Sequence, residues 1–169
     1  MKKLFITLFV GLMTITGAQA QRFALIDMEY ILENIDEYQT ATEKIQKASE
    51  KYQKEVESLT EEAKKLYESY QKAGNISDSE RTKRENAIIN KEKEASELKN
   101  KYYGQDGELA KMQDELLQPI EDKIYEAVKA VAQKKSYALI LDRASDAAIM
   151  FASPSIDVSD EVLEQLGIN

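Results

Sequence analysis

The chain has 169 residues and a formal net charge of −8, from 31 acidic and 23 basic side chains. It contains no His, Cys or Trp, which excludes disulfides, Cys/His metal sites and His-based acid–base catalysis. The acidic balance argues against nucleic acid as a partner, because its phosphates demand a basic surface. With only two Pro and six Gly, the composition favours long uninterrupted elements.

The N-terminus has the pattern of an export signal. Lys2 and Lys3 precede an uncharged, largely apolar run of 14 residues, 4–17, which is shorter than the roughly 20 needed to span a bilayer. Ala18-Gln19-Ala20 then supplies an A-x-A cleavage site. We therefore predict that residues 1–20 are a signal peptide cleaved after Ala20, and that the mature protein is exported and soluble.

The first part of the mature chain predicts a strand followed by a helix. Residues 22–27 form a short apolar run, and Asp27 is placed to cap a helix that begins near Met28. Residues 21–34 are therefore assigned to a small β body.

Residues 35–135 differ from both ends and predict a helical hairpin. Residues 36–135 hold 19 basic and 22 acidic side chains, whereas the other 49 mature residues hold 2 basic and 9 acidic. Apolar residues recur with a mean step of about 3.45, close to the 3.5-residue period of a coiled-coil seam. Glu43/Lys47, Glu50/Lys54 and Glu61/Lys65 are spaced to support the helix. The seam positions are Ile35, Tyr38, Ala41, Ile45, Ala48, Tyr52, Val56, Leu59, Ala63, Leu66, Tyr70 and Ala73.

The hairpin is predicted to reverse near residues 74–77. Gly74 is the residue expected past a helix C-terminus, in a left-handed conformation. Ser77 and Glu80 then have the spacing of a capping box that starts a second helix, running to about Lys135. Gly104, Gly107 and Pro119 lie inside this second helix and are the positions where the arm is expected to bend.

The C-terminal end completes the predicted β body, residues 136–169. Residues 137–142 and 147–152 are expected to be two strands joined by a polar loop. After Pro154, Ser159 is expected to cap a short helix over residues 160–166, with Gly167 at its end. The fold class is thus α+β, mainly α, with a long antiparallel helical hairpin inserted into a small discontinuous β body.

Such a body is too small to be stable alone, so we expect it to oligomerise. Tyr67 and Tyr103 lie beside the seam of the arms and are candidates for contacts with a partner, since Tyr offers a large rigid surface; surface tyrosines are also ordinary. The candidate oligomerisation residues are Phe23, Leu25, Ile26, Leu139, Ile140, Leu141, Ile149 and Phe151.

Catalysis has little support in this sequence. Asp27 and Asp142 both end apolar runs, and a helix cap and a turn residue explain them better than acid–base chemistry. No loop has EF-hand spacing and there is no Gly-rich phosphate loop, so we expect no metal or cofactor. The basic residues near the tip, such as Arg81 and Lys83, alternate with acidic ones and are interpreted as solvated charge.

The chain resembles the Skp/OmpH family of periplasmic chaperones over essentially the whole mature sequence. Phe23-Ala-Leu-Ile-Asp-Met-Glu-Tyr-Ile-Leu is similar to the family's opening strand and first helix. Tyr137-Ala-Leu-Ile-Leu-Asp and the segment Ile149-Met-Phe-Ala-Ser-Pro-Ser-Ile-Asp-Val-Ser-Asp-Glu-Val-Leu are similar to its closing part. The end segments are fairly specific, whereas the charged helices are generic.

The resemblance implies a jellyfish-shaped homotrimer in the periplasm, with helical tentacles around a cavity. It implies that unfolded outer-membrane β-barrel proteins are held there without ATP. The best-known relatives are basic and suited to acidic clients and lipopolysaccharide, whereas this chain has a pI of about 4.8. We therefore carry over no lipopolysaccharide or membrane site, and expect apolar and tyrosine contacts to outweigh net charge. The alternative is an envelope adaptor that binds one folded partner.

Overall fold

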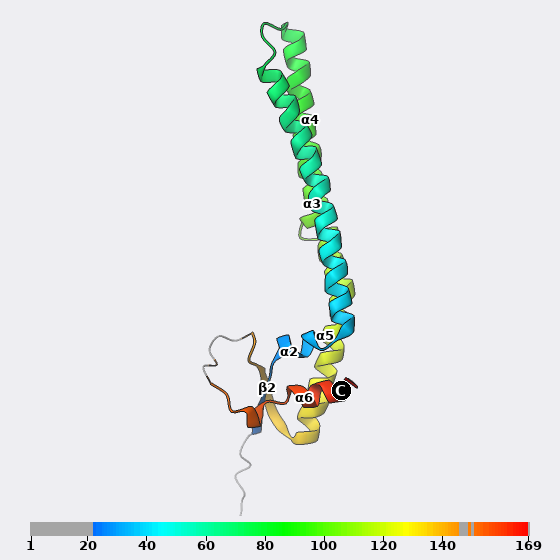
Figure 1. The fold of residues 1–169 in the computed structure, drawn as a ribbon, viewed down its shortest axis with the longest axis vertical. Coiled ribbons are helices and arrows are strands. Elements are labelled where there is room, and N and C mark those ends of the chain that lie inside the picture. Colours follow the sequence, from blue (N-terminus) through cyan, green and yellow to red (C-terminus); the bar gives the residue numbers. More distant parts are fainter. Residues whose placement is uncertain (1–21, 146–148, 150, 169) are drawn as a thin grey trace, which may run out of the picture.

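The computed structural model describes residues 22–145, 149 and 151–168, which form a long arm on a small body (Figure 1). The fold is mainly α with a small β body and long helices, as the sequence predicts. The signal peptide expected over residues 1–20 lies outside the described residues. The elements are β1 (Arg22–Ile26), α2 (Met28–Glu33), α3 (Asp36–Gln71), α4 (Asp78–Tyr103), α5 (Glu108–Lys135), β2 (Tyr137–Asp142), the 3₁₀ turn η1 (Pro154–Ile156) and α6 (Ser159–Gln165).

The sheet joins the two ends of the chain. β1 and β2 pair in parallel, with Phe23 opposite Leu139 and Leu25 opposite Leu141, and the whole arm forms the connection between them. The third strand expected over residues 147–152 includes positions outside the described residues, and Ile149, Phe151 and Ala152 are not in a strand. In the described part of the chain the sheet therefore has two strands.

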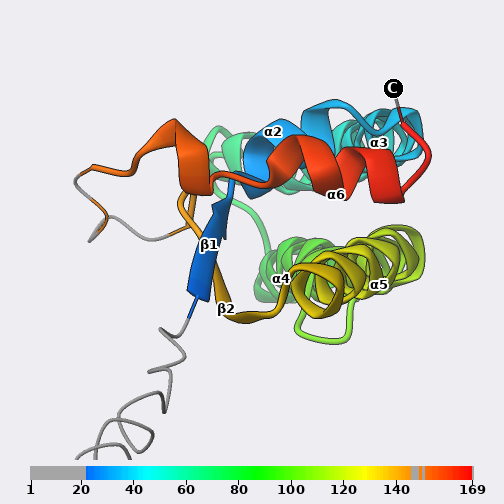
Figure 2. The same ribbon diagram turned by 90° about the horizontal axis from the view of Figure 1, so that it is seen from below.

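One face of the sheet packs on the core of the body. Because side chains alternate along a strand, Ala24 and Ile26 face the same way, and both are buried with Ile31 of α2. α5 contributes to this core as well as to the arm, and Figure 2 shows α6 lying beside α2. The other core residues are Ile35, Ala41, Ile120, Ile124, Ala127, Val131, Val158, Val162 and Leu163.

The arm is an antiparallel pair of helices, with α3 unbroken over 36 residues and α4 packed along its outer half. At a rise of 1.5 Å per residue, α3 is about 54 Å long. Most seam positions are buried or half-buried, but Leu66 is exposed. Of the predicted pairs, Glu43–Lys47 forms at 2.6 Å, whereas Glu50 accepts from Gln46 and Glu61 lies 3.8 Å from Lys64.

The tip reverses over residues 72–77. Ser77 caps α4 by accepting a hydrogen bond from the Glu80 N–H at 3.3 Å, as predicted. The left-handed conformation expected at Gly74 is wrong: in the described residues a positive φ occurs only at Gly167 (80°) and Ser136 (58°). The loop between Gln71 and Asp78 is long enough to reverse the chain without a left-handed residue at Gly74. None of the described helices is both long and apolar enough to cross a membrane.

Candidate interaction surfaces

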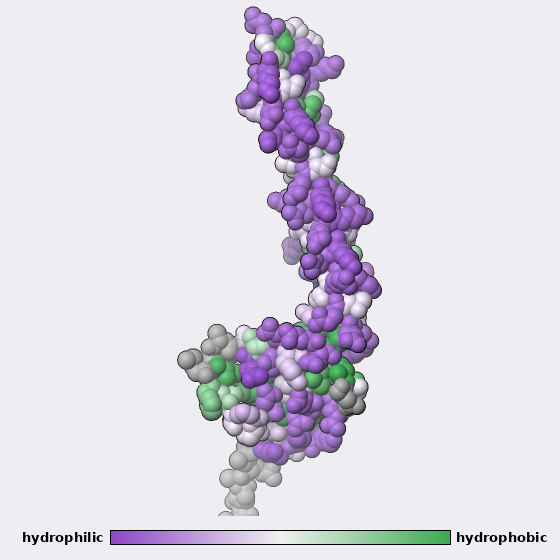
Figure 3. Space-filling view, viewed as in Figure 1, coloured by the Kyte–Doolittle hydropathy of each residue, from purple (hydrophilic) through white to green (hydrophobic). Residues whose placement is uncertain are grey.

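The outer face of the sheet is apolar and largely uncovered, except at Leu25. Phe23 is 56 % exposed, Leu139 52 % and Leu141 41 %, and the strand register places them on the face opposite the core. We call these three residues the sheet patch. Phe151, in the segment between β2 and η1, is 86 % exposed. Figure 3 shows apolar surface gathered on the body, whereas the arm is mostly hydrophilic.

The other residues expected to mediate association are covered within the single chain to different degrees. Ile26 lies in the core, and Ile140 packs against it from β2. Leu25 is also buried, because the segment around Asp157 pairs with β1 at this point and the Val158 N–H donates to the Leu25 carbonyl at 2.9 Å. Ile149 is half-buried.

The two off-seam tyrosines of the arm differ in their surroundings. Tyr67 is half exposed, and within the described residues its hydroxyl accepts a hydrogen bond only from the neighbouring Gln71 side chain, at 2.9 Å. Tyr103 is less exposed, and its hydroxyl donates to the Ser49 carbonyl of α3 at 2.9 Å. The Tyr67 side chain is thus the freer of the two for an outward contact.

Sequence reasoning missed an exposed apolar residue near Tyr67. The Tyr70 hydroxyl donates to the Glu85 carboxylate across the hairpin at 2.6 Å, so these two residues lie at one level of the arm. Tyr67 and Ile89 each lie one helical turn further from the tip, on the same helix faces, and therefore share the next level of the arm. Ile89 is 58 % exposed. It follows the buried Ile88 directly, so the seam spacing of α4 already placed it off the seam.

The three residues expected to bend the arm lie in two different settings. Gly104 ends α4 and Gly107 precedes α5, so both lie in the break between these helices. Pro119 lies inside α5, which continues past it to Lys135.

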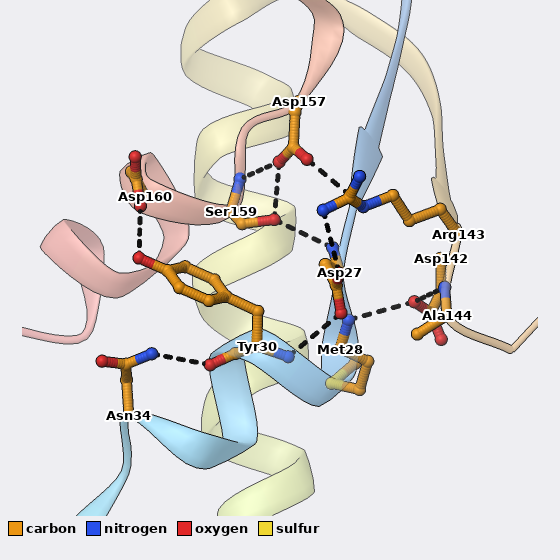
Figure 4. A network of polar contacts seen from close by, with 10 residues as sticks. All are labelled: Asp27, Met28, Tyr30, Asn34, Asp142, Arg143, Ala144, Asp157, Ser159 and Asp160. Atoms are coloured by element: carbon orange, nitrogen blue, oxygen red, sulfur yellow. Dashed lines mark hydrogen bonds and ion pairs between the residues drawn. The ribbon is translucent and has the colours of Figure 1, made fainter. Parts of the chain in front are cut away.

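Asp27 and Asp142 lie in a polar network at the C-terminal ends of β1 and β2 (Figure 4). Asp27 caps α2 by accepting from the Tyr30 N–H at 3.0 Å, and it forms an ion pair with Arg143 at 2.9 Å. Asp142 accepts from the Met28 and Ala144 N–H groups, both at 3.0 Å. Burial raises the pKa of Asp142, but these backbone donors outweigh it and leave the pKa below its usual value. Both carboxylates therefore have structural partners, as the cap and turn interpretation requires.

The same network ties α6 to β1. Ser159, 5 % exposed, accepts from the Asp27 N–H at 2.8 Å and donates to Asp157 at 2.6 Å. The Asp157 carboxylate also forms an ion pair with Arg143 at 3.4 Å, so Arg143 links Asp157 to Asp27. Ser159 is thus the first residue of α6 rather than its cap, because its hydroxyl is used between segments. Among the described residues no group of carboxylates is arranged to hold a metal ion.

Comparisons with known proteins agree with this architecture. The sequence matches the family described as "Outer membrane protein (OmpH-like)" over residues 22–166. This chain belongs to the OmpH-like family. It is 27 % identical to the chaperone protein Skp of Yersinia enterocolitica, over 98 % of this chain and 99 % of that protein. These relatives are chaperones rather than enzymes.

A solved structure supports the fold independently. An OmpH-like protein from Caulobacter crescentus matches with a TM-score of 0.62, over 89 % of this chain and 86 % of the other, at 13 % identity. At that identity the likeness concerns the fold alone. The small body with a projecting helical arm is thus shared with a solved member of the family.

Proposed function

We propose that this protein is an ATP-independent holdase of the periplasm. It binds unfolded outer-membrane β-barrel proteins in a cavity between helical arms and prevents their aggregation. The observation that carries this proposal is the combination of an open apolar sheet face on the body with a long solvated arm that carries isolated exposed apolar side chains. Membership of the OmpH-like family and the likeness to Skp support it.

The cavity requires several arms, and the sheet patch provides a reason for assembly. An uncovered apolar face at the end of a small body is stabilised when another copy buries it. We infer a homotrimer in which Phe23, Leu139, Leu141 and Phe151 meet their counterparts. Ile26 and Ile140 support that face from the core side, whereas Leu25 lies on the outer face beside the patch, next to the segment around Asp157. Ile149 would contribute from the segment that follows β2. Export would follow cleavage after Ala20.

Weak, adaptable contacts suit a protein that holds unfolded chains. We assign Tyr67 to direct contact with clients, and Tyr103, which is partly exposed, to a second contact. Because the chain is acidic, apolar contacts carry more of the binding than charge attraction. The arm would adapt to clients through Gly104, Gly107 and Pro119.

Aggregation of a client tests the proposal directly. Residues 21–169 are mixed with a urea-unfolded outer-membrane β-barrel on dilution, and light scattering is followed without ATP. We expect scattering to fall and to saturate near one client per three chains, with little change at high salt. Suppression should weaken in Tyr67→Ala/Ile89→Ala, with Tyr125→Ala as a matched control because Tyr125 is 66 % exposed at the base of the arm.

Failure to suppress aggregation of several different barrels would overturn the holdase proposal. The envelope adaptor would then become the leading function, and capture of a single folded partner would be the next measurement. A strong loss of suppression at high salt would instead show that charge dominates client binding.

A further inference from the structure

Two tyrosine rings meet face to face between the helices of the arm. Tyr52 of α3 and Tyr102, the penultimate residue of α4, stack with ring centroids 3.9 Å apart and planes at 8°. Aromatic pairs more often have centroids about 4.5–7 Å apart. At the shorter separation, carbon atoms of the two rings are in van der Waals contact. No other tyrosine in the described part of the chain stacks on a second aromatic ring.

Neighbouring contacts hold the two rings in this arrangement. The Tyr102 side chain is buried, and its hydroxyl donates to the Glu55 carboxylate of α3. The Tyr103 hydroxyl donates to the Ser49 carbonyl of α3 at 2.9 Å. Ser49 and Glu55 lie about one helical turn to either side of Tyr52. The end of α4 is therefore attached to α3 on both sides of the ring pair.

Each of the two stacked tyrosines also has a carboxylate beside its hydroxyl. The hydrogen bond to Glu55, with burial second, raises the pKa of Tyr102 to about 12. Burial raises the pKa of Tyr52, and a hydrogen bond to Glu108 adds to this rise. Lys101, 3.2 Å from Glu108, lowers the pKa of Glu108 and so keeps it ionised. Both phenols are thus neutral at pH 7, and each lies beside a group that can accept its proton.

We propose that Tyr52 and Tyr102 form a site of oxidative cross-linking, at which a one-electron oxidant of the peroxyl or carbonate radical class converts the ring pair into dityrosine. Such an oxidant is small, and the half-buried Tyr52 ring is where it reaches the pair. The product joins α3 to α4 through a carbon–carbon bond.

The reaction balances with two oxidant molecules. Each ring gives one electron to an oxidant molecule and its hydroxyl proton to the neighbouring carboxylate, which passes the proton to water. The two tyrosyl radicals then couple through one Cε carbon of each ring. The hydrogen on each coupled carbon moves to the phenolic oxygen and restores the aromatic rings. In total, one C–C bond replaces two C–H bonds, two oxidant molecules are reduced, and two protons are released.

The cross-link would connect residues that are fifty positions apart in the sequence. It closes a loop, residues 52–102, that contains the outer part of α3, the tip and most of α4. A covalent link across so long a loop restricts the unfolded chain. Oxidation at this site would therefore stabilise the outer part of the arm.

Peptide mapping after photo-oxidation tests this proposal. Residues 21–169, at low concentration, are irradiated with tris(bipyridine)ruthenium(II) and persulfate, which supply one-electron oxidants. The band of single-chain size is then cut from a denaturing gel, so that only links within one chain are counted, and is digested with trypsin. Cleavage after lysine gives peptides 52–54 and 102–111. The linked product has the summed mass of these two peptides less two hydrogen atoms.

We expect the linked peptide from the unmodified chain and none from Tyr52→Phe or Tyr102→Phe. Tyr103→Phe should still give it, which separates Tyr102 from its neighbour in the same peptide. Tyr125→Phe is the matched control, because Tyr125 is 66 % exposed and has no stacked partner among the described residues, and should leave the yield unchanged. Glu55→Gln should lower the yield several-fold, because the Tyr102 hydroxyl loses its proton acceptor.

Absence of the linked peptide from the unmodified chain, under conditions that oxidise Tyr125, would overturn the proposal. An equal yield from the chain unfolded in urea would also overturn it, because random encounters would then explain the link. An unchanged yield in Glu55→Gln, with its helix content intact, would overturn the role of the carboxylate. These measurements need no client, so their outcome is independent of the aggregation assay.

Discussion

The body and the arm are stabilised in different ways. The body has a core drawn from both ends of the chain, where Ile31, Ile124 and Val162 are fully buried, and a polar network organised by Arg143. The arm has a narrow seam with few buried residues, among them Ala63, Ile88 and Ala95, and most of its ion pairs are exposed. The body therefore depends on specific packing, whereas the arm depends on helix propensity and many weak contacts.

The charge distribution follows the same division. Residues 36–135 are nearly balanced, with 19 basic and 22 acidic side chains, whereas the remaining 49 residues after Ala20 carry 2 basic and 9 acidic. Like charges on neighbouring bodies repel one another. The proposed assembly through the sheet patch would therefore have to overcome repulsion, whereas the arms would be close to neutral toward a client.

The largest expected difference between the two regions concerns assembly. Leu139→Glu places a charge in the sheet patch, and because a buried unpaired carboxylate is costly we expect the oligomer to dissociate, with affinity reduced at least about 100-fold. Ile89→Glu, at a similarly exposed position of the arm, should leave the oligomer intact. Sedimentation velocity measures both. An oligomer that survives Leu139→Glu would show that the sheet patch is not the interface. Added salt screens the repulsion between bodies and should therefore strengthen assembly of the unmodified protein.

Core truncation compares the packing of the two regions. Ile31→Ala removes a side chain that is 0 % exposed in the body and should lower the free energy of unfolding by about 3 kcal/mol. Ile88→Ala, in the seam of the arm, should cost about 1–2 kcal/mol because the two-helix seam relaxes more easily. Urea denaturation followed by circular dichroism gives both values. Equal losses would mean that the arm is packed as tightly as the body.

The polar network of the body can be tested at Ser159. Ser159→Ala removes the hydroxyl that links the Asp27 N–H to Asp157 and leaves a buried backbone donor without this partner. We expect a loss of about 1–2 kcal/mol in the free energy of unfolding. Ser79→Ala, an exposed serine in the first turn of α4, is the matched control and should change stability by less than about 0.5 kcal/mol. A loss no larger than that of the control would show that the network adds nothing to stability.

A smaller effect is expected from alkaline titration of the arm. The hydrogen bond to Glu55, with burial second, raises the pKa of Tyr102 to about 12. A tyrosine whose pKa is raised on folding adds stability that is fully present below its pKa in the unfolded chain, about 10. That stability is lost as the pH rises through the pKa of the same tyrosine in the folded protein. We therefore expect the hydrogen bond of Tyr102 to Glu55 to lose its stabilising effect between about pH 10 and pH 12. Several tyrosines have a raised pKa, so tyrosinate absorbance should show a group of late tyrosines, and Glu55→Gln should move the Tyr102 step of that group to lower pH.

The alkaline titration has a reference in the body. The hydrogen bond that Tyr30 makes to Asp160 raises the pKa of Tyr30 as well, so this tyrosine should be unaffected by Glu55→Gln. If no tyrosine shifts in that variant, Glu55 does not hold the Tyr102 hydroxyl in solution.

The sequence alone determined the features that depend on local pattern. The 3.5-residue spacing of apolar residues predicted the long helices, and Asp27 and Ser77 predicted two caps. These features follow from backbone propensity and short-range hydrogen bonds, which neighbouring residues set. The same spacing misjudged Leu66, which is exposed although Tyr70, nearer the tip, is half-buried.

Only the tertiary structure decided which groups from distant segments meet. The parallel pairing of β1 with β2 separates Phe23 and Leu139 from Ala24 and Ile26, and so decides which apolar residues remain open. Tyr102 stacks on Tyr52 fifty residues earlier, and Arg143 joins Asp27 to Asp157. Such contacts depend on strand register and on the level at which two helices align, and neither is encoded in the spacing of residues along one segment.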